Sequence, residues 1–333
     1  MTEYTAPWKL KAAVGIEPTY GNAVTVTDLI PLLSCSMEYN RELIPYTPVD
    51  ADGFEETPQK SFVVAGGSFE TYYDGNNIDP LLHSLMGTHL TRGGTDSELF
   101  YCTDTSIVPP SLTFVASRFR NKVTGSIEKM EFPGTVITGA TFTGEAGQPL
   151  RINWNAISKD IYDIDLAGTD LVNTDDSGWV YPYNKNILQF RQATTVTLTI
   201  PSLSNVTLTI SSFTIEVVNN YSSEYPANES DFCIGQPART ALTVNAEFTI
   251  PNYSDSTAFD TLYTAFDRGS EVELRCYLYD DAVLQGGFYA QRCILEMPKV
   301  INDINFKIRM RCIKPTSGYS SPILISSHSI ANR

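Results

Sequence analysis

Within Ser61–Gly87, SFVVAGGSFETYYDGNNIDPLLHSLMG, the spacing of hydrophobic residues changes once, from the alternation of a strand to the spacing of a helix. Residues 61–73 form a long extended run with alternating side chains, which predicts a strand, and residues 74–77 form a turn cluster. A short helix is expected next, with Pro80 in its first turn and Gly87 after its last residue. Its apolar residues recur at helical spacing: Ile78, Leu81, Leu82, Leu85 and Met86.

A second stretch, Thr240–Gly269, repeats this order. Residues 240–250 alternate as a strand, a polar turn follows, and Ser256–Arg268 is expected to be a helix that ends at a glycine. Each unit is preceded by a strand and a long irregular loop, residues 42–59 in the first half and 221–237 in the second. The repeated order predicts a duplicated domain.

The rest of the chain consists mainly of short alternating runs bounded by turn residues. Lys9–Gly21 is expected to be an arm or leading turn, Thr88–Thr95 a turn, and Gly318–Arg333 a Ser-rich tail. The other expected strands are 29–41, 97–102, 111–118, 122–132, 136–142, 150–156, 194–200, 206–219, 271–279, 287–297 and 304–313.

These elements predict a mostly β protein made of two tandem β-sandwich or barrel domains, each with a short flanking α-helix. The first domain is expected at residues 1–160 and the second at 161–333. A linker over 158–190 joins them, and the second domain carries the Ser-rich C-terminal tail.

The chain has 333 residues and a formal net charge of −15. This charge argues against a protein that grips nucleic acid through phosphates, because such grip needs clustered Lys and Arg. No apolar run reaches the roughly 20 residues that span a bilayer, so no membrane association is expected. The N-terminus lacks a signal-peptide pattern, so the protein is expected to stay in a cytoplasm or to leave by cell lysis.

Known catalytic and metal-binding motifs are missing from the sequence. The three histidines are His83, His89 and His328, and a structural or surface role is expected for them. The six cysteines form no CxxC pair and lie mostly in apolar runs, which favours buried reduced thiols. No catalytic residue, metal site or cofactor is therefore expected.

Several segments together resemble the major tail tube proteins of long-tailed bacteriophages. In that family a Gly-x-Glu-x-x-Tyr-Gly segment leads to a strand, a long loop, a second strand and a flanking helix. The segments that carry the resemblance are AAVGIEPTYG at 12–21, LLSCSMEYN at 32–40, the stretch 66–87, SLTFVAS at 111–117 and KVTGSIEKMEF at 122–132. The resemblance covers residues 10–157, and the second half matches by element order alone.

The resemblance implies a structural virion protein that is made in the host cytoplasm. Its copies would stack as rings into the tail tube that conveys DNA into the bacterium. Family members with two tandem domains form trimeric, pseudo-hexameric rings, so a trimer is expected in preference to a hexamer. The implied partners are further copies, the tape measure, tail tip and terminator proteins, and passing double-stranded DNA without specific binding.

If six domains contribute four strands each, the barrel radius is roughly 24 Å, enough for a duplex of about 20 Å. The polar strand faces are expected to line this lumen with Glu and hydroxyl groups rather than Lys or Arg. Periodicity fixes the alternation but not its direction, so an outward polar face stays open. The residues of these faces are Ser34, Ser36, Glu38, Asn40, Ser68, Glu70, Ser212, Thr214, Glu216, Thr243, Asn245, Glu247 and Thr249.

The long loop 42–59 carries three prolines and several acids, and loops of this length usually have a function. In the resembling family this loop reaches the next ring. The residues expected to make that contact are Glu42, Pro45, Tyr46, Pro48, Asp50, Asp52, Phe54, Glu55 and Glu56.

Other classes of protein fit parts of the pattern. One is a capsid decoration or baseplate β-sandwich, which would not form tubes or open rings. Another is a carbohydrate-binding module, for which Trp154 and Trp179 would have to form an exposed platform. An enzyme has the least support, because no catalytic constellation is present.

Overall fold

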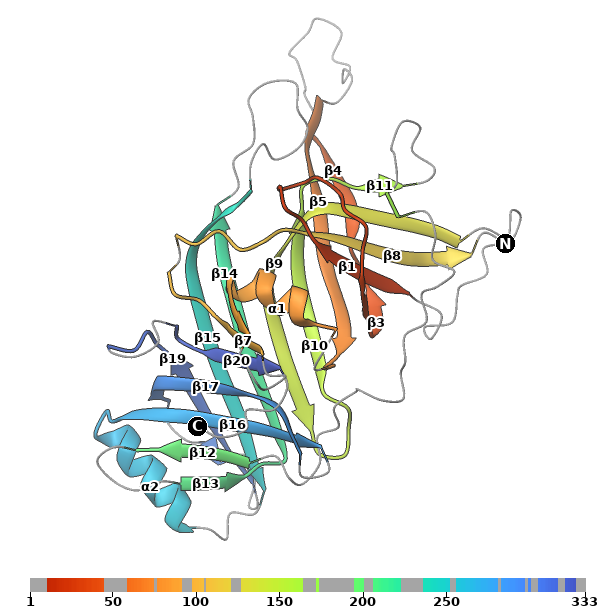
Figure 1. Ribbon diagram of the computed structural model, residues 1–333. Coiled ribbons are helices and arrows are strands. Elements are labelled where there is room, and N and C mark those ends of the chain that lie inside the picture. The colour runs from red at the N-terminus through yellow and green to blue at the C-terminus, as the bar shows by residue number, and fades with distance from the viewer. Residues whose placement is uncertain are drawn as a thin grey trace, which may run out of the picture.

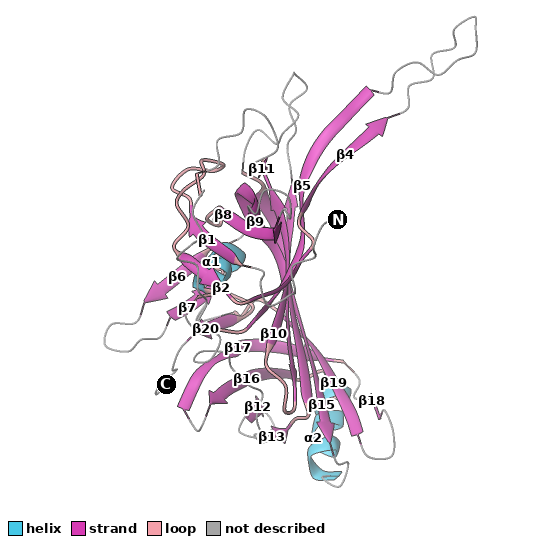
Figure 2. Ribbon diagram, turned by 90° about the vertical axis from the view of Figure 1, so that its right-hand side faces the viewer, coloured by secondary structure: helices cyan, strands magenta, loops and turns pink. Residues whose placement is uncertain are grey.

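The computed structural model describes residues 11–44, 59–74, 77–91, 98–104, 106–120, 127–163, 172–173, 195–200, 206–222, 236–251, 256–280, 283–296, 299–300, 305–316 and 321–327. These residues form twenty strands and two helices, which confirms the mostly β class. Long antiparallel strands run side by side along the molecule as one central sheet (Figure 1). The helix α1 and the strands β1, β6 and β7 lie together on one side of it (Figure 2).

The first half of the chain builds one end of the central sheet. β3 (Leu32–Cys35) and β4 (Glu38–Ile44) both pair with β5 (Gln59–Tyr72), β5 pairs with β10 (Arg151–Ser158), and β10 pairs with β9 (Ile127–Glu145). The N-terminal part of β9 leaves this sheet for a second layer. There β9 pairs with β8 (Leu112–Arg120) and β11 (Tyr162–Asp163), β8 with β1 (Ala12–Ile16), and β1 with β2 (Asp28–Ile30).

The second half builds the other end. β14 (Ser212–Ser222) pairs with β15 (Ala238–Pro251), and β15 pairs with β19 (Asn305–Cys312). β19 pairs with both β17 (Val283–Leu295) and β18 (Lys299–Val300). β17 continues into a second layer, in which it pairs with β16 (Glu271–Asp280), β16 with β12 (Thr195–Thr199), and β12 with β13 (Val206–Thr209).

Two strand contacts join the halves. β9 pairs with β14 over seven positions, from Gly139↔Val218 to Glu145↔Ser212, so the central sheet is continuous. β20 (Leu324–Ser327), close to the C-terminus, lies between β17 of the second half and β7 (Glu98–Tyr101) of the first, and β6 (Thr88–Thr91) pairs with β7.

A buried polar clamp reinforces this junction at the C-terminal end of α1 (Asp79–Met86). Arg239 of β15, only 5% exposed, donates to the carbonyls of Leu85 (2.7 Å) and Met86 (3.1 Å). Asn219 of β14 donates to the Leu85 carbonyl at 2.7 Å. A helix C-terminus carries partial negative charge and unpaired carbonyls, so a cation there is favourable.

Both predicted helices are confirmed. Six of the eight residues of α1 are buried, and Gly87 ends the helix with a left-handed φ of 89°. α2 (Ser256–Asp267) buries Leu262 and Ala265, and its Phe259 ring meets Phe306 edge-on at 5.4 Å.

A continuous aromatic core lies under the central sheet. Neighbouring rings lie 4.7–6.2 Å apart along the series Phe132, Phe114, Phe69, Trp154, Phe142, Phe288 and Phe213. Trp154 has no exposed surface, and its Nε1 donates to the Thr71 hydroxyl at 2.9 Å. It therefore cannot serve as an exposed carbohydrate platform, and Trp179 lies outside the described residues.

Three segments expected to be irregular contain strands instead. The expected arm at residues 9–21 contains β1, the expected turn at 88–95 contains β6, and the Ser-rich tail contains the buried strand β20. Each strand has five residues or fewer. β1 and β20 pair with strands far away in the chain, whereas β6 pairs with the next strand, β7. Such short strands carry little periodic signal of their own.

Other strand boundaries also differ from those expected. β9 is one strand of 19 residues that passes through Pro133-Gly134, because Gly134 adopts a left-handed φ of 67° and donates its N–H to Glu17. Residues 206–219 hold two strands, β13 and β14, and residues 29–41 contribute to three, β2, β3 and β4. The expected loop 42–59 is shorter at both ends, because residues 42–44 belong to β4 and Gln59 begins β5.

Candidate functional site

The side of the central sheet away from the aromatic core is polar. Residues paired across antiparallel strands point to the same side, so the register defines rows of side chains across this face. One row runs Tyr72, Arg151, Thr143, Thr214, Glu247, Arg309, and the next runs Glu70, Asn153, Thr141, Glu216, Asn245, Arg311. We call this surface the polar face.

The residues expected to line a lumen share this polar face. Ser34, Ser36 and Glu38 are exposed at its first edge, and Ser36 and Ser68 are linked by their hydroxyls at 2.9 Å. Asn40 lies in β4, where its backbone pairs with Val64, and its side chain is outside the described part of the face. The second half adds the remaining residues through β14 and β15: Ser212, Thr214, Glu216, Thr243, Asn245, Glu247 and Thr249.

Three further strands contribute residues that the sequence reasoning missed. β10 supplies Arg151, Asn153 and Asn155, β9 supplies Thr141 and Thr143, and β19 supplies Lys307, Arg309 and Arg311. Alternation in the sequence could have identified them, because RINWNA (151–156) and FKIRMR (306–311) alternate polar and apolar residues as strictly as the strands from which the lumen residues were predicted.

These additions correct the expectation that Glu and hydroxyl groups alone cover the face. Among the side chains that the structure describes, four basic ones lie on it, and three of them contact carboxylates. Arg151 lies 3.5 Å from Glu70, and Glu247 contacts both the Lys307 ammonium (2.5 Å) and the Arg309 guanidinium. Partial burial would raise the pKa of Glu247, but hydrogen bonds from Lys307 and Arg309 outweigh it and hold the pKa below its usual range.

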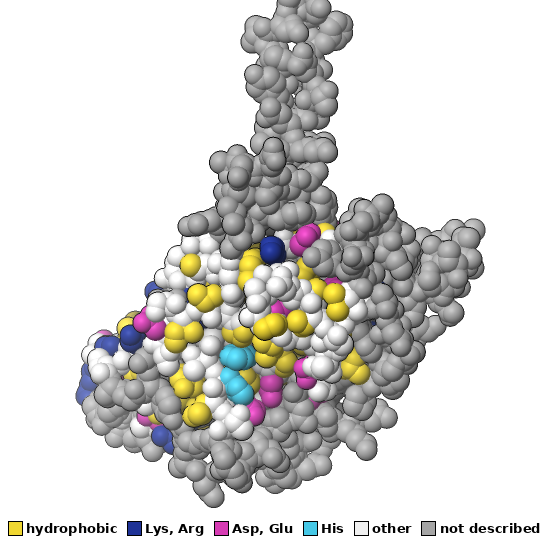
Figure 3. Space-filling model, turned by 45° about the horizontal axis from the view of Figure 1, so that its top comes forward, with side chains coloured by type: hydrophobic (Ala, Val, Ile, Leu, Met, Phe, Trp, Pro, Cys, Tyr) yellow, Lys and Arg dark blue, Asp and Glu magenta, His cyan; other side chains and the backbone are white. Residues whose placement is uncertain are grey.

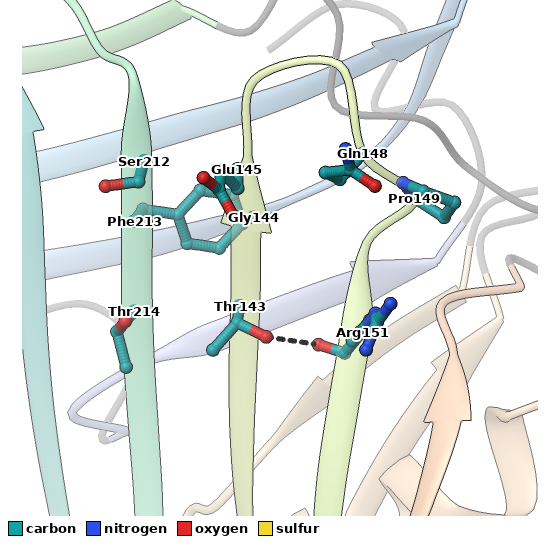
Figure 4. Close-up of a pocket in the computed structure, with 9 residues that line it drawn as sticks. All are labelled: Thr143, Gly144, Glu145, Gln148, Pro149, Arg151, Ser212, Phe213 and Thr214. Atoms are coloured by element: carbon teal, nitrogen blue, oxygen red, sulfur yellow. Dashed lines mark hydrogen bonds between the residues drawn. The ribbon is translucent and has the colours of Figure 1, made fainter. Parts of the chain in front are cut away.

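Two shallow grooves indent the polar face. One, of about 440 Å³, lies at the β9–β10 turn and is lined by Glu145, Gln148, Arg151 and Ser212 (Figure 4). The other, of about 340 Å³, lies over β14, β15 and β19 and is lined by Glu216, Asn245, Glu247, Glu296 and Arg309.

The expected loop contact cannot be placed on this face. Glu42 lies in β4, and Pro45, Tyr46, Pro48, Asp50, Asp52, Phe54, Glu55 and Glu56 lie outside the described residues.

Away from the polar face, two titratable side chains, His83 and His89, lie close together. The His83 and His89 rings lie 5.4 Å apart, and His89 contacts Glu98. Histidine side chains are visible at the surface in Figure 3. Burial, followed by the nearby His89, lowers the pKa of His83. In the described part of the chain, no group of three or more His, Cys, Asp or Glu could hold a metal ion.

The cysteines that the structure describes are unbridged. They are Cys35, Cys102, Cys276, Cys293 and Cys312, and all but Cys35 are buried. The Cys293 and Cys312 sulfurs lie 3.4 Å apart on paired strands, and burial raises the pKa of Cys276 to about 12.

Comparison with known families gives an independent assignment. The family model described as phage tail tube protein matches residues 9–298, most of the chain. A search of curated proteins gave no match. Neither described helix has the length and apolar content to cross a membrane. The chain therefore belongs to the phage tail tube protein family, and it is a structural protein of the virion tail that assembles with other tail proteins into the tube.

Proposed function

We propose that three copies of this chain close into a ring, that rings stack into the tail tube, and that the polar face lines the channel through which DNA is ejected. Family membership supports the tube. The strand order supports the geometry of the ring, because the second half repeats the pairing of the first.

The repeat extends over seven strand positions. The first half pairs in the order β2–β1–β8–β9–β10–β5–β3/β4, and the second in the order β13–β12–β16–β17/β18–β19–β15–β14. α1 follows β5, and α2 follows β15, the strand in the equivalent position. We infer that the chain is two copies of one domain, in the ranges 1–160 and 161–333.

The internal junction supplies a template for contacts between copies, and this observation carries the proposal. Inside the chain, β14 pairs with the C-terminal part of β9. The equivalent of β14 is β3/β4, and the equivalent of that part of β9 is the end of β17 with β18. Among the described residues, β3 and β4 pair only with β5, and β18 pairs only with β19, whereas the last residues of β17 already pair with both β16 and β19. The open edge of the second half is therefore β18. The two outer edges of the sheet would thus join between neighbouring chains as β14 joins β9.

Three chains would then supply six domains with four strand positions each. The resulting closed barrel has a radius of roughly 24 Å, wide enough for a duplex. The core side of the sheet is apolar and covered, so the polar face is the one suited to water and passing DNA.

The mass of isolated rings, measured by native mass spectrometry and accompanied by electron microscopy, tests the proposal. We expect closed rings of three chains with near-sixfold projections. Rings of six chains, or open filaments without a channel, would refute the trimer. The tape measure, tail tip and terminator proteins are the proposed partners at the ends and inside of the tube.

A further inference from the structure

The cations of the polar face are unevenly distributed along it. Lys307, Arg309 and Arg311 follow one another on β19 at every second residue, so neighbouring charges are about 6.7 Å apart along the strand. The intervening residues Ile308 and Met310 are buried, which fixes the three basic side chains on the polar face. We call these three residues the β19 basic row.

The basic row is accessible, and a single carboxylate contacts two of its three cations. The Lys307 side chain is 37% exposed and the Arg309 side chain 53%, and both contact the single carboxylate of Glu247. Glu247 is directly opposite Arg309 in the ladder and less exposed than either cation, at 24%. Arg311 is exposed and has no ion pair among the described residues.

Charge distinguishes this row from the rest of the face. A phosphate backbone binds where cations lie in a row and are not already paired, because each phosphate contact releases a counterion. With Glu247 present, the row offers one unpaired cation, Arg311. Without that carboxylate it would offer three, spread over about 13 Å of strand.

We propose that the β19 basic row is a latent binding site for the DNA phosphate backbone, and that Glu247 keeps it closed. In the tube, Glu247 would hold Lys307 and Arg309 against the wall, so that DNA passes without pausing. That consequence rests on the proposed lumen, whereas the latent site itself depends only on the geometry of β15 and β19.

Glu247→Gln tests the site by removing the charge while keeping the size of the side chain. Binding of a 20-base-pair duplex to the full-length, unassembled chain is measured by fluorescence anisotropy at 50–200 mM salt. At 50 mM salt we expect the variant to bind at least tenfold more tightly than the parent. The slope of log K against log salt should become more negative by about 1.8, for two released cations.

Glu145→Gln is the matched control. Glu145 lies on the same face, on β9, and has no ion pair in the described part of the chain, so the variant changes net charge equally without releasing a cation. It should bind DNA like the parent. Glu247→Gln combined with Arg309→Gln should lose most of the gained affinity.

Equal binding by the two single variants, or no gain for Glu247→Gln, would overturn the latent site. A second arm separates this result from the proposed function. In assembled particles, Glu247→Gln should slow DNA ejection most at low salt. Tight binding by the free chain combined with unchanged ejection would place the basic row outside the lumen and refute that part of the proposed function.

Discussion

The glutamate of the Gly-x-Glu-x-x-Tyr-Gly segment should be a structural residue whose loss destabilises the first half. Glu17 is 5% exposed, and each of its carboxylate oxygens accepts two hydrogen bonds. Oε1 accepts from the Thr113 hydroxyl and the Gly134 N–H, both at 2.9 Å. Oε2 accepts from the Ser111 hydroxyl at 2.7 Å and the Gly21 N–H at 2.9 Å. One side chain thus ties the turn after β1 to β8 and to the point where β9 changes layers.

The expected magnitude follows from these four contacts. Glu17→Gln replaces one acceptor oxygen by an NH₂ group in either orientation. The hydroxyl on that side can rotate to accept a hydrogen bond, but the backbone N–H of Gly21 or Gly134 cannot and is left without an acceptor. A buried unsatisfied donor costs about 1–3 kcal/mol, and the lost charge-assisted bonds add about as much again. We expect a loss of roughly 2–4 kcal/mol, and more for Glu17→Ala.

Urea unfolding followed by tryptophan fluorescence measures this loss as a shift of the midpoint at constant slope. The control is Glu38→Gln, an exposed carboxylate of the polar face, which should stay within about 0.5 kcal/mol of the parent. A change below about 1 kcal/mol for Glu17→Gln would refute the structural role and leave the glutamate of the segment unexplained.

Three further outcomes are expected. Burial, reinforced by the nearby carboxylates of Glu98, Asp74 and Asp28, raises the pKa of Asp79 to about 7. Its neutral form therefore stabilises the fold fully below about pH 4, and this stability is lost as the pH rises through 7. Above pH 7, the free energy of unfolding of Asp79→Asn, measured with urea, should exceed that of the parent by roughly 2–4 kcal/mol, and the difference should vanish near pH 4. A pH-independent difference would contradict this. Arg239→Met leaves the carbonyls of Leu85 and Met86 with fewer hydrogen-bond donors, so it should lower the free energy of unfolding by about 2–4 kcal/mol. The control Arg268→Met, at the exposed end of α2, should leave it unchanged, and thermal unfolding measures both. Deletion of residues 46–56 should leave a folded chain that no longer forms tubes in electron micrographs; normal tubes would exclude a role for this segment between rings.

Much of the fold was encoded locally in the sequence. Alternation identified the long strands β5, β10, β15 and β19, and helical spacing with Pro80 and Gly87 identified α1. The same alternation assigned Glu70 and Glu247 to one side of their strands and Phe69 and Phe248 to the other, because a strand repeats every two residues.

Distant contacts decided the rest. The sequence showed no strand at β6 or β20, because each has only four residues, too few for a periodic signal, and β20 is stabilised by strands far away in the chain. It placed a break at Pro133-Gly134, where the Glu17 carboxylate instead lets β9 continue into a second layer. The polar face likewise became one surface only through pairing: Glu247 faces Lys307 and Arg309, some 60 residues away, because β15 and β19 share a register. Periodicity gives each strand its two sides, but which strands become neighbours, and so which charges meet, depends on long-range pairing that no local pattern encodes.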